Sequence, residues 1–190
     1  MTNTTHLETL NFRQVQLHEN AIIKPFDSED EDLNDFLLHD AKNYLQSLLA
    51  VTYLLQTEDE TIAYYCLSND RITRDDKAKS AWNRVNRAVA NEKRRKSYPA
   101  IKIGRLAVSK KYARLGLGKM IIDTVIEMYT ALRQQAGCRF ITVDAYHNAT
   151  HFYEKNDFKY LTDEDDHDET RAMYLDLKAY LTVHQNHIIN

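Results

Sequence analysis

The stretch that decides the fold is "GRLAVSKKYARLGLGKMIIDTVI", residues 104–126. It begins with apolar residues typical of a strand and ends with apolar residues at the spacing of an amphipathic helix. Gly116 and Gly118 lie where the strand gives way to the helix. The N–H groups at a helix start can bind phosphate, and glycine lets a phosphate approach the backbone closely. The sequence therefore predicts a phosphate-binding turn at this junction.

Composition narrows the class of protein. The chain has 190 residues, of which 43% are hydrophobic and 28% charged, enough for one domain with a sizeable core. Its net charge of -3 gives no global indication of nucleic-acid binding. No apolar run approaches the roughly 20 residues that a membrane helix needs, and the first residues, "MTNTTHLETLNFRQ", lack the apolar core of a signal peptide. Cys66 and Cys138 belong to no CxxC motif, which fits a reducing compartment. We expect a soluble cytoplasmic protein.

Apolar periodicity predicts the order of the elements. The expected elements are a helix over 32–48, a hairpin of strands over 51–56 and 61–69, a strand over 100–108, a helix over 117–137, a strand over 139–146, a short helix over 148–156, and strands over 158–161 and 171–178. This order is typical of a mixed α/β (α+β) protein with a central sheet. We expect one domain, residues 1–190, with a tail over 179–190 that has no clear assignment.

The stretch from Arg71 to Lys96 differs from the rest because it holds ten basic and three acidic residues. Its apolar residues, Trp82 among them, share one helical face, which predicts an amphipathic helix packed on the core. The opposite side carries Arg84, Arg87 and Arg94. We expect this basic helical insert, residues 71–98, to end at "SYP", since a residue before proline disfavours the helical region.

Three phosphate-binding motifs have a strand, a glycine turn and a helix in this order. A Walker loop needs a glycine four residues before its Gly-Lys pair and Ser or Thr after it. Here Met120 follows Lys119 in place of Ser or Thr, and Arg114 supplies no upstream glycine, so this motif is excluded. A dinucleotide fingerprint needs a third glycine where this chain has Ile121. The third motif is the pyrophosphate turn of the GNAT acyltransferases, in which Gln or Arg is followed by two residues, a glycine, one residue, and glycine or alanine.

The chain resembles the GNAT superfamily over about residues 24–177. The segment Ala113–Gly118 matches the two small positions of the turn, although Ala113 stands where Gln or Arg is usual. Downstream, "HNATHFYEKNDFKYL" is similar to the family's Asn-x-x-Ala-x-x-Phe-Tyr-x-Lys-x-Gly-Phe segment. Asp157 replaces the usual glycine before Phe158, and Asp tolerates a left-handed backbone better than most residues. We expect the turn there to survive.

The resemblance implies a central mixed, mostly antiparallel sheet with two splayed parallel strands and helices on both faces. It implies an N-acetyltransferase in which a primary amine attacks acetyl-CoA directly within a ternary complex, with a backbone N–H near Ala107 or Val108 facing the carbonyl oxygen. Tyr153 occupies the position of the acid that protonates the leaving thiolate, and Phe152 beside it is expected to pack. The residues implied in acetyl-CoA binding are Leu106, Ala107, Val108, Ala113, Arg114, Leu115, Gly116, Leu117, Gly118, Lys119 and Asn148.

Other polar residues are less distinctive. Asp144 and Tyr146 are candidate general bases, and water alone is the alternative. The acidic run around His167 lacks the ligand spacing of a calcium loop, so we expect a solvated loop and no metal. Asn148 could equally cap a helix. Cys138 and Trp82 are expected to pack.

A narrower resemblance concerns the acceptor. The segments "KPFDSEDEDLNDFL", "AYYCLSN" and "IGRLAVSKKYARLGLGKMII" are similar to segments of the tRNA-acetylating GNAT toxins. In that branch the acceptor is aminoacyl-tRNA and the partner is an antitoxin, and Arg84, Arg87 and Arg94 would contact RNA phosphates. A small-molecule or protein amine is the alternative acceptor, and an acyl-CoA-binding module without turnover is an alternative function. Family members often form homodimers, and no membrane partner is expected.

Overall fold

The computed structural model describes residues 10–74, 79–89, 96–131, 136–161 and 169–185. Contacts divide the chain into two compact units, Met1–Ser68 with Ile103–Thr124, and Asn69–Lys102 with Val125–Asn190. We call them unit 1 and unit 2, and strands β3 and β4 contribute to both. The predicted single domain stays a prediction. No helix among the described residues has the length and apolarity needed to cross a membrane.

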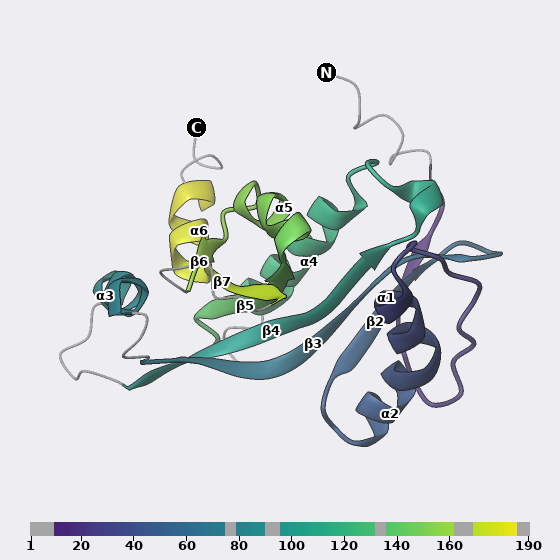
Figure 1. The fold of residues 1–190 in the computed structure, drawn as a ribbon, viewed down its shortest axis with the longest axis horizontal. Helices are drawn as coiled ribbons and strands as arrows, with labels where there is room; N and C mark the ends of the chain where they lie inside the picture. The colour runs from purple at the N-terminus through teal and green to yellow at the C-terminus, as the bar shows by residue number, and fades with distance from the viewer. Residues whose placement is uncertain (1–9, 75–78, 90–95, 132–135, 162–168, 186–190) are drawn as a thin grey trace. The chain divides into compact units, whose positions relative to one another are not determined.

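Seven strands form one sheet in the order β1-β2-β3-β4-β5-β7-β6 (Figure 1). Most neighbours are antiparallel, and one pair is parallel, which confirms the predicted fold class. The strands are β1 Arg13–Gln16, β2 Val51–Gln56, β3 Thr61–Thr73, β4 Ser97–Val108, β5 Phe140–Tyr146, β6 Lys159–Tyr160 and β7 Thr170–Asp176. The helices are α1 Glu31–Asp35, α2 Ala41–Gln46, α3 Lys79–Ala88, α4 Leu117–Ala131, α5 Thr150–Glu154 and α6 Leu177–Gln185, with short turns η1 Phe36–Asp40, η2 Lys110–Tyr112 and η3 His147–Ala149.

In unit 1, helices α1 and α2 lie against strands β2 and β3 (Figure 1). Asp30 caps α1, because its carboxylate accepts the Leu33 N–H at 3.1 Å. The predicted helix over 32–48 is interrupted by the π-helical turn η1, which places Phe36 and Leu37 in the core. The guanidinium of Arg105 on β4 lies 5.4 Å from the Phe36 ring centroid and 3.4 Å from the Asp32 carboxylate. These contacts join α1 to β4.

Unit 2 contains the basic stretch, and its structure differs from the prediction of one helix. Arg71 lies in β3, the "SYP" residues lie in β4, and only Lys79–Ala88 is a described helix. The Arg74 N–H donates to the Lys96 carbonyl at 3.1 Å, and the Pro99 carbonyl accepts the Arg139 N–H at 3.0 Å. The two ends of the insert therefore lie in strands, and a helix lies between them. Pairing with strands remote in sequence outweighs the local helical pattern of residues at those ends.

The apolar face of α3 packs on this hairpin. Val85 is fully buried in a cluster with Tyr98, Phe140 and Tyr174. Trp82 stacks on Tyr98 with ring centroids 5.6 Å apart, as expected for a core residue. The amphipathic pattern of α3 is therefore explained, as predicted, by the packing of its apolar face on the core.

Two elements were not predicted. Strand β1 pairs with β2 in antiparallel register from Arg13 opposite Gln56 to Gln16 opposite Tyr53. The tail without assignment includes α6, whose start is capped by the Asp176 carboxylate at 2.9 Å from the Lys178 N–H. Helix α6 packs on β7 in unit 2.

Candidate active site

The predicted phosphate-binding turn lies in unit 1, between β4 and α4. The backbone of Arg114 has a φ of 63° and that of Gly116 a φ of 93°, so the chain takes two left-handed steps before the helix. The first helical hydrogen bond runs from the Met120 N–H to the Gly116 carbonyl at 3.0 Å. As at any helix start, the N–H groups before this one have no acceptor within the helix. A turn followed by a helix start therefore lies at this junction, and its binding of phosphate stays a prediction.

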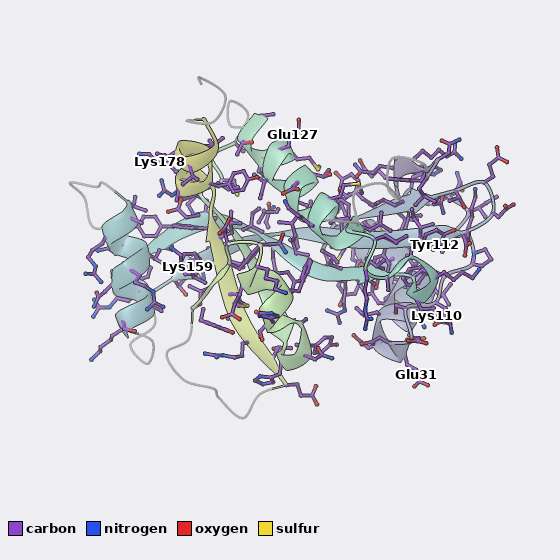
Figure 2. All side chains as sticks on the ribbon, turned by 90° about the horizontal axis from the view of Figure 1, so that it is seen from above. Glu31, Lys110, Tyr112, Glu127, Lys159 and Lys178 are labelled. Carbon is purple, nitrogen blue, oxygen red and sulfur yellow. The ribbon has the colours of Figure 1, made fainter. Side chains whose placement is uncertain are left out.

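The segment before the turn, which carries Lys110 and Tyr112 (both labelled in Figure 2), is fixed by ion pairs. Lys110 lies 2.9 Å from the Asp27 carboxylate, and its N–H donates to the Asp27 carbonyl at 2.9 Å. The Tyr112 hydroxyl and the Lys111 ammonium bind the Glu60 carboxylate at 3.0 and 2.9 Å. These anchors were missed by sequence reasoning, because Asp27 and Glu60 are remote from the motif.

The same contacts shift the pKa values of the acids. The hydrogen bond from the Lys110 ammonium, supported by the Glu29 N–H and the Asn34 amide, lowers the pKa of Asp27 to about 2. The Lys111 ammonium likewise lowers the pKa of Glu60. Both carboxylates are ionised at neutral pH and hold the cations that precede the turn.

The expected ligand of this turn is a pyrophosphate group. The helix N-terminus carries a partial positive charge, and the backbone just before it is left-handed at Arg114 and Gly116. Leu117 is 1% exposed and holds the start of α4 in the core. Lys119, the expected counter-charge, binds the Asp123 carboxylate at 2.7 Å along the helix. We therefore expect backbone N–H groups to be the main hydrogen-bond donors to that ligand.

The predicted strand positions belong to the same unit as the turn. Leu106, Ala107 and Val108 are the last residues of β4. Ala107 is buried, whereas Leu106 and Val108 are half-buried. The Ser109 N–H donates to the Ile62 carbonyl on β3 at 2.8 Å, which fixes this end of the strand.

Tyr153 and Asn148 belong to unit 2. Tyr153 is 6% exposed on the short helix α5, and its ring packs against Phe152 and Phe158 with centroids 5.0 and 5.3 Å away. Both Phe152 and Tyr153 therefore pack, although only Phe152 was expected to. Asn148 is exposed in the turn η3.

A local motif fixes the position of Tyr153. The Phe158 N–H donates to the Tyr153 carbonyl at 3.1 Å, and the Asp157 N–H donates to the Glu154 carbonyl at 3.1 Å. Asp157 has a φ of 66°, which confirms the left-handed turn expected at the replaced glycine. These bonds form a Schellman motif, and the Tyr153–Phe158 ring contact is the apolar contact that accompanies it. The sequence "FYEKNDF" therefore determines where Tyr153 sits on α5.

Burial raises the pKa of the Tyr153 hydroxyl above its ordinary value of about 10. The phenol is protonated throughout the neutral range, as an acid must be before it acts. The candidate bases are less suited. Asp144 forms an ion pair with Lys102, and Tyr146 is half-buried at the end of β5.

The basic residues named for substrate binding are only partly described. Arg84 and Arg87 are exposed on α3, and Arg94 lies outside the described residues. The Arg84 guanidinium donates to the Tyr160 carbonyl at 3.0 Å, and the Arg87 guanidinium donates to the Asn83 carbonyl at 3.1 Å. Both side chains are therefore held in defined positions.

No three His, Cys, Asp or Glu side chains gather as metal ligands in the described part of the chain. His167 and its acidic run lie outside that part. Cys138 is half-buried, and its thiol donates to the Phe140 carbonyl at 3.3 Å. Burial raises its pKa, which suits a packing residue.

The family model for the acetyltransferase (GNAT) domain matches residues 83–177. The chain belongs to the GNAT acetyltransferase family. It is therefore an N-acetyltransferase whose acetyl donor is acetyl-CoA, as the turn and the "FYEKNDF" segment predicted. No curated protein sequence matches the chain significantly.

Several solved structures share this GNAT fold. A tyrosine-to-phenylalanine mutant of KacT is 20% identical, with a TM-score of 0.73 over 92% of this chain and 99% of that one. AtaT complexed with acetyl-methionyl-tRNAfMet is 18% identical, with a TM-score of 0.72 over 91% and 99%. A tyrosine-to-phenylalanine mutant of AtaT bound to acetyl-CoA and the C-terminus of the antitoxin AtaR is 18% identical, with a TM-score of 0.72 over 91% and 97%. The GNAT fold thus extends over nearly the whole chain.

Proposed function

We propose that the chain is a toxin-type GNAT enzyme that transfers the acetyl group of acetyl-CoA to the amino group of aminoacyl-tRNA. The observation that carries this proposal is the likeness to AtaT complexed with acetyl-methionyl-tRNAfMet over 91% of this chain and 99% of that one. The similarity of the first helix, of "AYYCLSN" and of the pyrophosphate turn to the tRNA-acetylating toxins supports it independently.

The donor site would use the backbone of unit 1. The N–H groups of Gly118 and Lys119, which follow the left-handed backbone at Gly116, would bind the pyrophosphate. Leu106 and Val108 would hold the pantetheine arm through their backbone groups. Bound acetyl-CoA supplies an activated acetyl thioester.

Tyr153 would act as the acid. Its hydroxyl carries a proton at neutral pH because burial raises its pKa. Its ring contacts with Phe152 and Phe158 limit its motion, so the proton stays at one place. A held donor of this kind stabilises a leaving thiolate.

The acceptor RNA would be bound by the basic residues of the insert. Arg84 and Arg87 are exposed cations on one helix, and guanidinium groups suit phosphate. Each phosphate contact contributes a salt-dependent part of the affinity. Binding of charged tRNA should therefore weaken steeply as salt rises.

We also propose an antitoxin partner and a cytoplasmic location. AtaT bound to AtaR is the neighbour that supports the partner. The free cysteines Cys66 and Cys138 suit a reducing compartment. Co-expression with the product of the adjacent gene should yield a co-purifying complex, and its absence would remove the partner.

The test of the function is acetyl transfer from labelled acetyl-CoA. The purified chain is incubated with total charged tRNA and, in parallel, with small amines and peptides. We expect label in the tRNA fraction, released by mild alkali as an N-acetylated amino acid because the aminoacyl ester is cleaved. Label only in small amines or peptides would assign a different acceptor, and acetyl-CoA binding without any product would indicate a binding module.

The donor site can be tested by an alanine substitution at Gly116, with the same substitution at Gly137, outside the turn, as the matched control. Gly116→Ala places a Cβ on a left-handed backbone and should weaken acetyl-CoA binding by about tenfold or more, about 1.4 kcal/mol. Gly137→Ala adds a Cβ with no atom within 4 Å and should leave the affinity unchanged. Calorimetry measures both, and equal affinities for the two variants would show that the turn does not bind the donor.

A further inference from the structure

Unit 2 contains a cavity that the acetyl-donor site does not use. It has a volume of about 440 Å³ and is lined by α3, β6, β7 and α6. This volume falls within the roughly 300–1,000 Å³ of small-molecule sites. None of its lining residues belongs to the pyrophosphate turn, the end of β4 or the Tyr153 segment Thr150–Glu154.

Its walls are apolar and aromatic. The side chains of Ala88, Leu175, Ala179 and Val183 contribute aliphatic surface. Val183 is 58% exposed although apolar, so the cavity opens to the surface beside it. Tyr174 lines the same space, and an aromatic ligand could contact its ring.

Three cations meet at this apolar space. Arg84 and Arg87 come from successive turns of α3, and Lys159 comes from β6, labelled in Figure 2. Of the lining acids, Asp176 is already neutralised by Arg139, whose guanidinium lies 2.6 Å from its carboxylate. Asp157 remains, so the cavity carries an excess of positive charge.

One of these cations is held in place. Arg84 donates to the Tyr160 carbonyl at 3.0 Å and also bonds the Tyr174 hydroxyl. A guanidinium has five N–H donors, so these contacts leave donors for a further acceptor. A pre-positioned guanidinium loses little freedom when an anion binds.

We propose that this cavity binds a small aromatic anion, whose ring occupies the apolar walls and whose acidic group contacts Arg84, Arg87 and Lys159. Arg84 and Arg87 are also the cations that would contact the phosphates of the acceptor RNA, so a small anion in the cavity would compete with that RNA for them. It adds a second ligand site to the protein, built entirely from unit 2.

The experiment is a fluorescence titration of the full chain with 8-anilinonaphthalene-1-sulfonate, an aromatic anion. Saturating coenzyme A is present so that the donor site does not take the dye. The control probe is N-phenyl-1-naphthylamine, which has the same rings without the sulfonate. We expect one anionic dye per chain, bound about tenfold more tightly than the neutral one, because hydrogen bonds to charged groups are worth about that factor.

Three variants locate the dye, and thermal unfolding verifies that each is folded. Arg87→Gln should weaken the anionic dye about tenfold without affecting the neutral one. Val183→Phe should weaken both by filling the cavity. Lys178→Gln removes a cation of the same helix α6 outside the cavity lining and should change neither. The proposal would be overturned if the two dyes bound with equal affinity. It would also be overturned if Arg87→Gln and Lys178→Gln had equal effects, or if Val183→Phe had none.

Discussion

Replacing Tyr153 by phenylalanine tests the proposed acid with a change of one oxygen atom. The ring contacts with Phe152 and Phe158, 5.0 and 5.3 Å between centroids, do not involve that oxygen and remain. The free energy of unfolding should therefore change by less than about 1 kcal/mol, whereas Tyr153→Ala would leave a cavity costing about 3–5 kcal/mol. General acid catalysis contributes about 10²–10⁴ in rate, so kcat should fall by that factor. This corresponds to a rise of about 3–5 kcal/mol in the activation free energy.

The assay combines three measurements on the same preparation. Acetyl transfer to the acceptor of highest activity gives kcat, calorimetry gives the affinity for acetyl-CoA, and thermal unfolding gives stability. Tyr53→Phe is the matched control, because it also removes a hydroxyl from a tyrosine in ring contact, here with Tyr65 at 5.0 Å. Full activity of Tyr153→Phe, or a loss of kcat shared with Tyr53→Phe, would refute the role.

The remaining predictions concern stability. Asp157→Gly should raise the melting temperature slightly, because it relieves about 1 kcal/mol of left-handed strain at φ 66°. Asp157→Val should lower the melting temperature, because a β-branched side chain increases that strain. The opposite order in thermal unfolding would contradict the Schellman assignment. Gly104→Ala should destabilise by about 1–3 kcal/mol, because its Cβ would meet the Cys66 sulfur at 3.0 Å, and adding Cys66→Ala should recover part of the loss in a denaturant double-mutant cycle. Asp27 has a folded pKa of about 2, below its unfolded value, so its contribution is present above about pH 4 and lost as pH falls toward 2. Acid titration of the wild type and Asp27→Asn should therefore converge at low pH, and parallel curves would argue against this linkage.

The local structural features predicted correctly are those that depend on neighbours in the chain. Glycine at 116 favours a left-handed step before a helix, and the apolar period of residues 117–131 places that helix on the core. Asp157 was correctly expected to adopt a left-handed backbone, because the motif around Tyr153 is closed by hydrogen bonds within six residues.

The parts that were missed depend on partners far away. The "SYP" segment lies in a strand because the Pro99 carbonyl accepts from Arg139. The anchors Asp27 and Glu60 bind Lys110 and Lys111 across long stretches of sequence. No local pattern encodes such pairs, since each requires the sheet to form first.

By itself the sequence determined the glycine turn before α4, the short helix that carries Tyr153 and the GNAT family of the chain. These features follow from φ preferences and from the spacing of side chains along one segment. Only the tertiary structure decided that the Arg84 guanidinium donates to the Tyr160 carbonyl. It also decided that α3, α6 and β7 line a common cavity. Cavities and long-range bonds arise where remote segments pack, and packing depends on shapes that no single stretch of sequence contains.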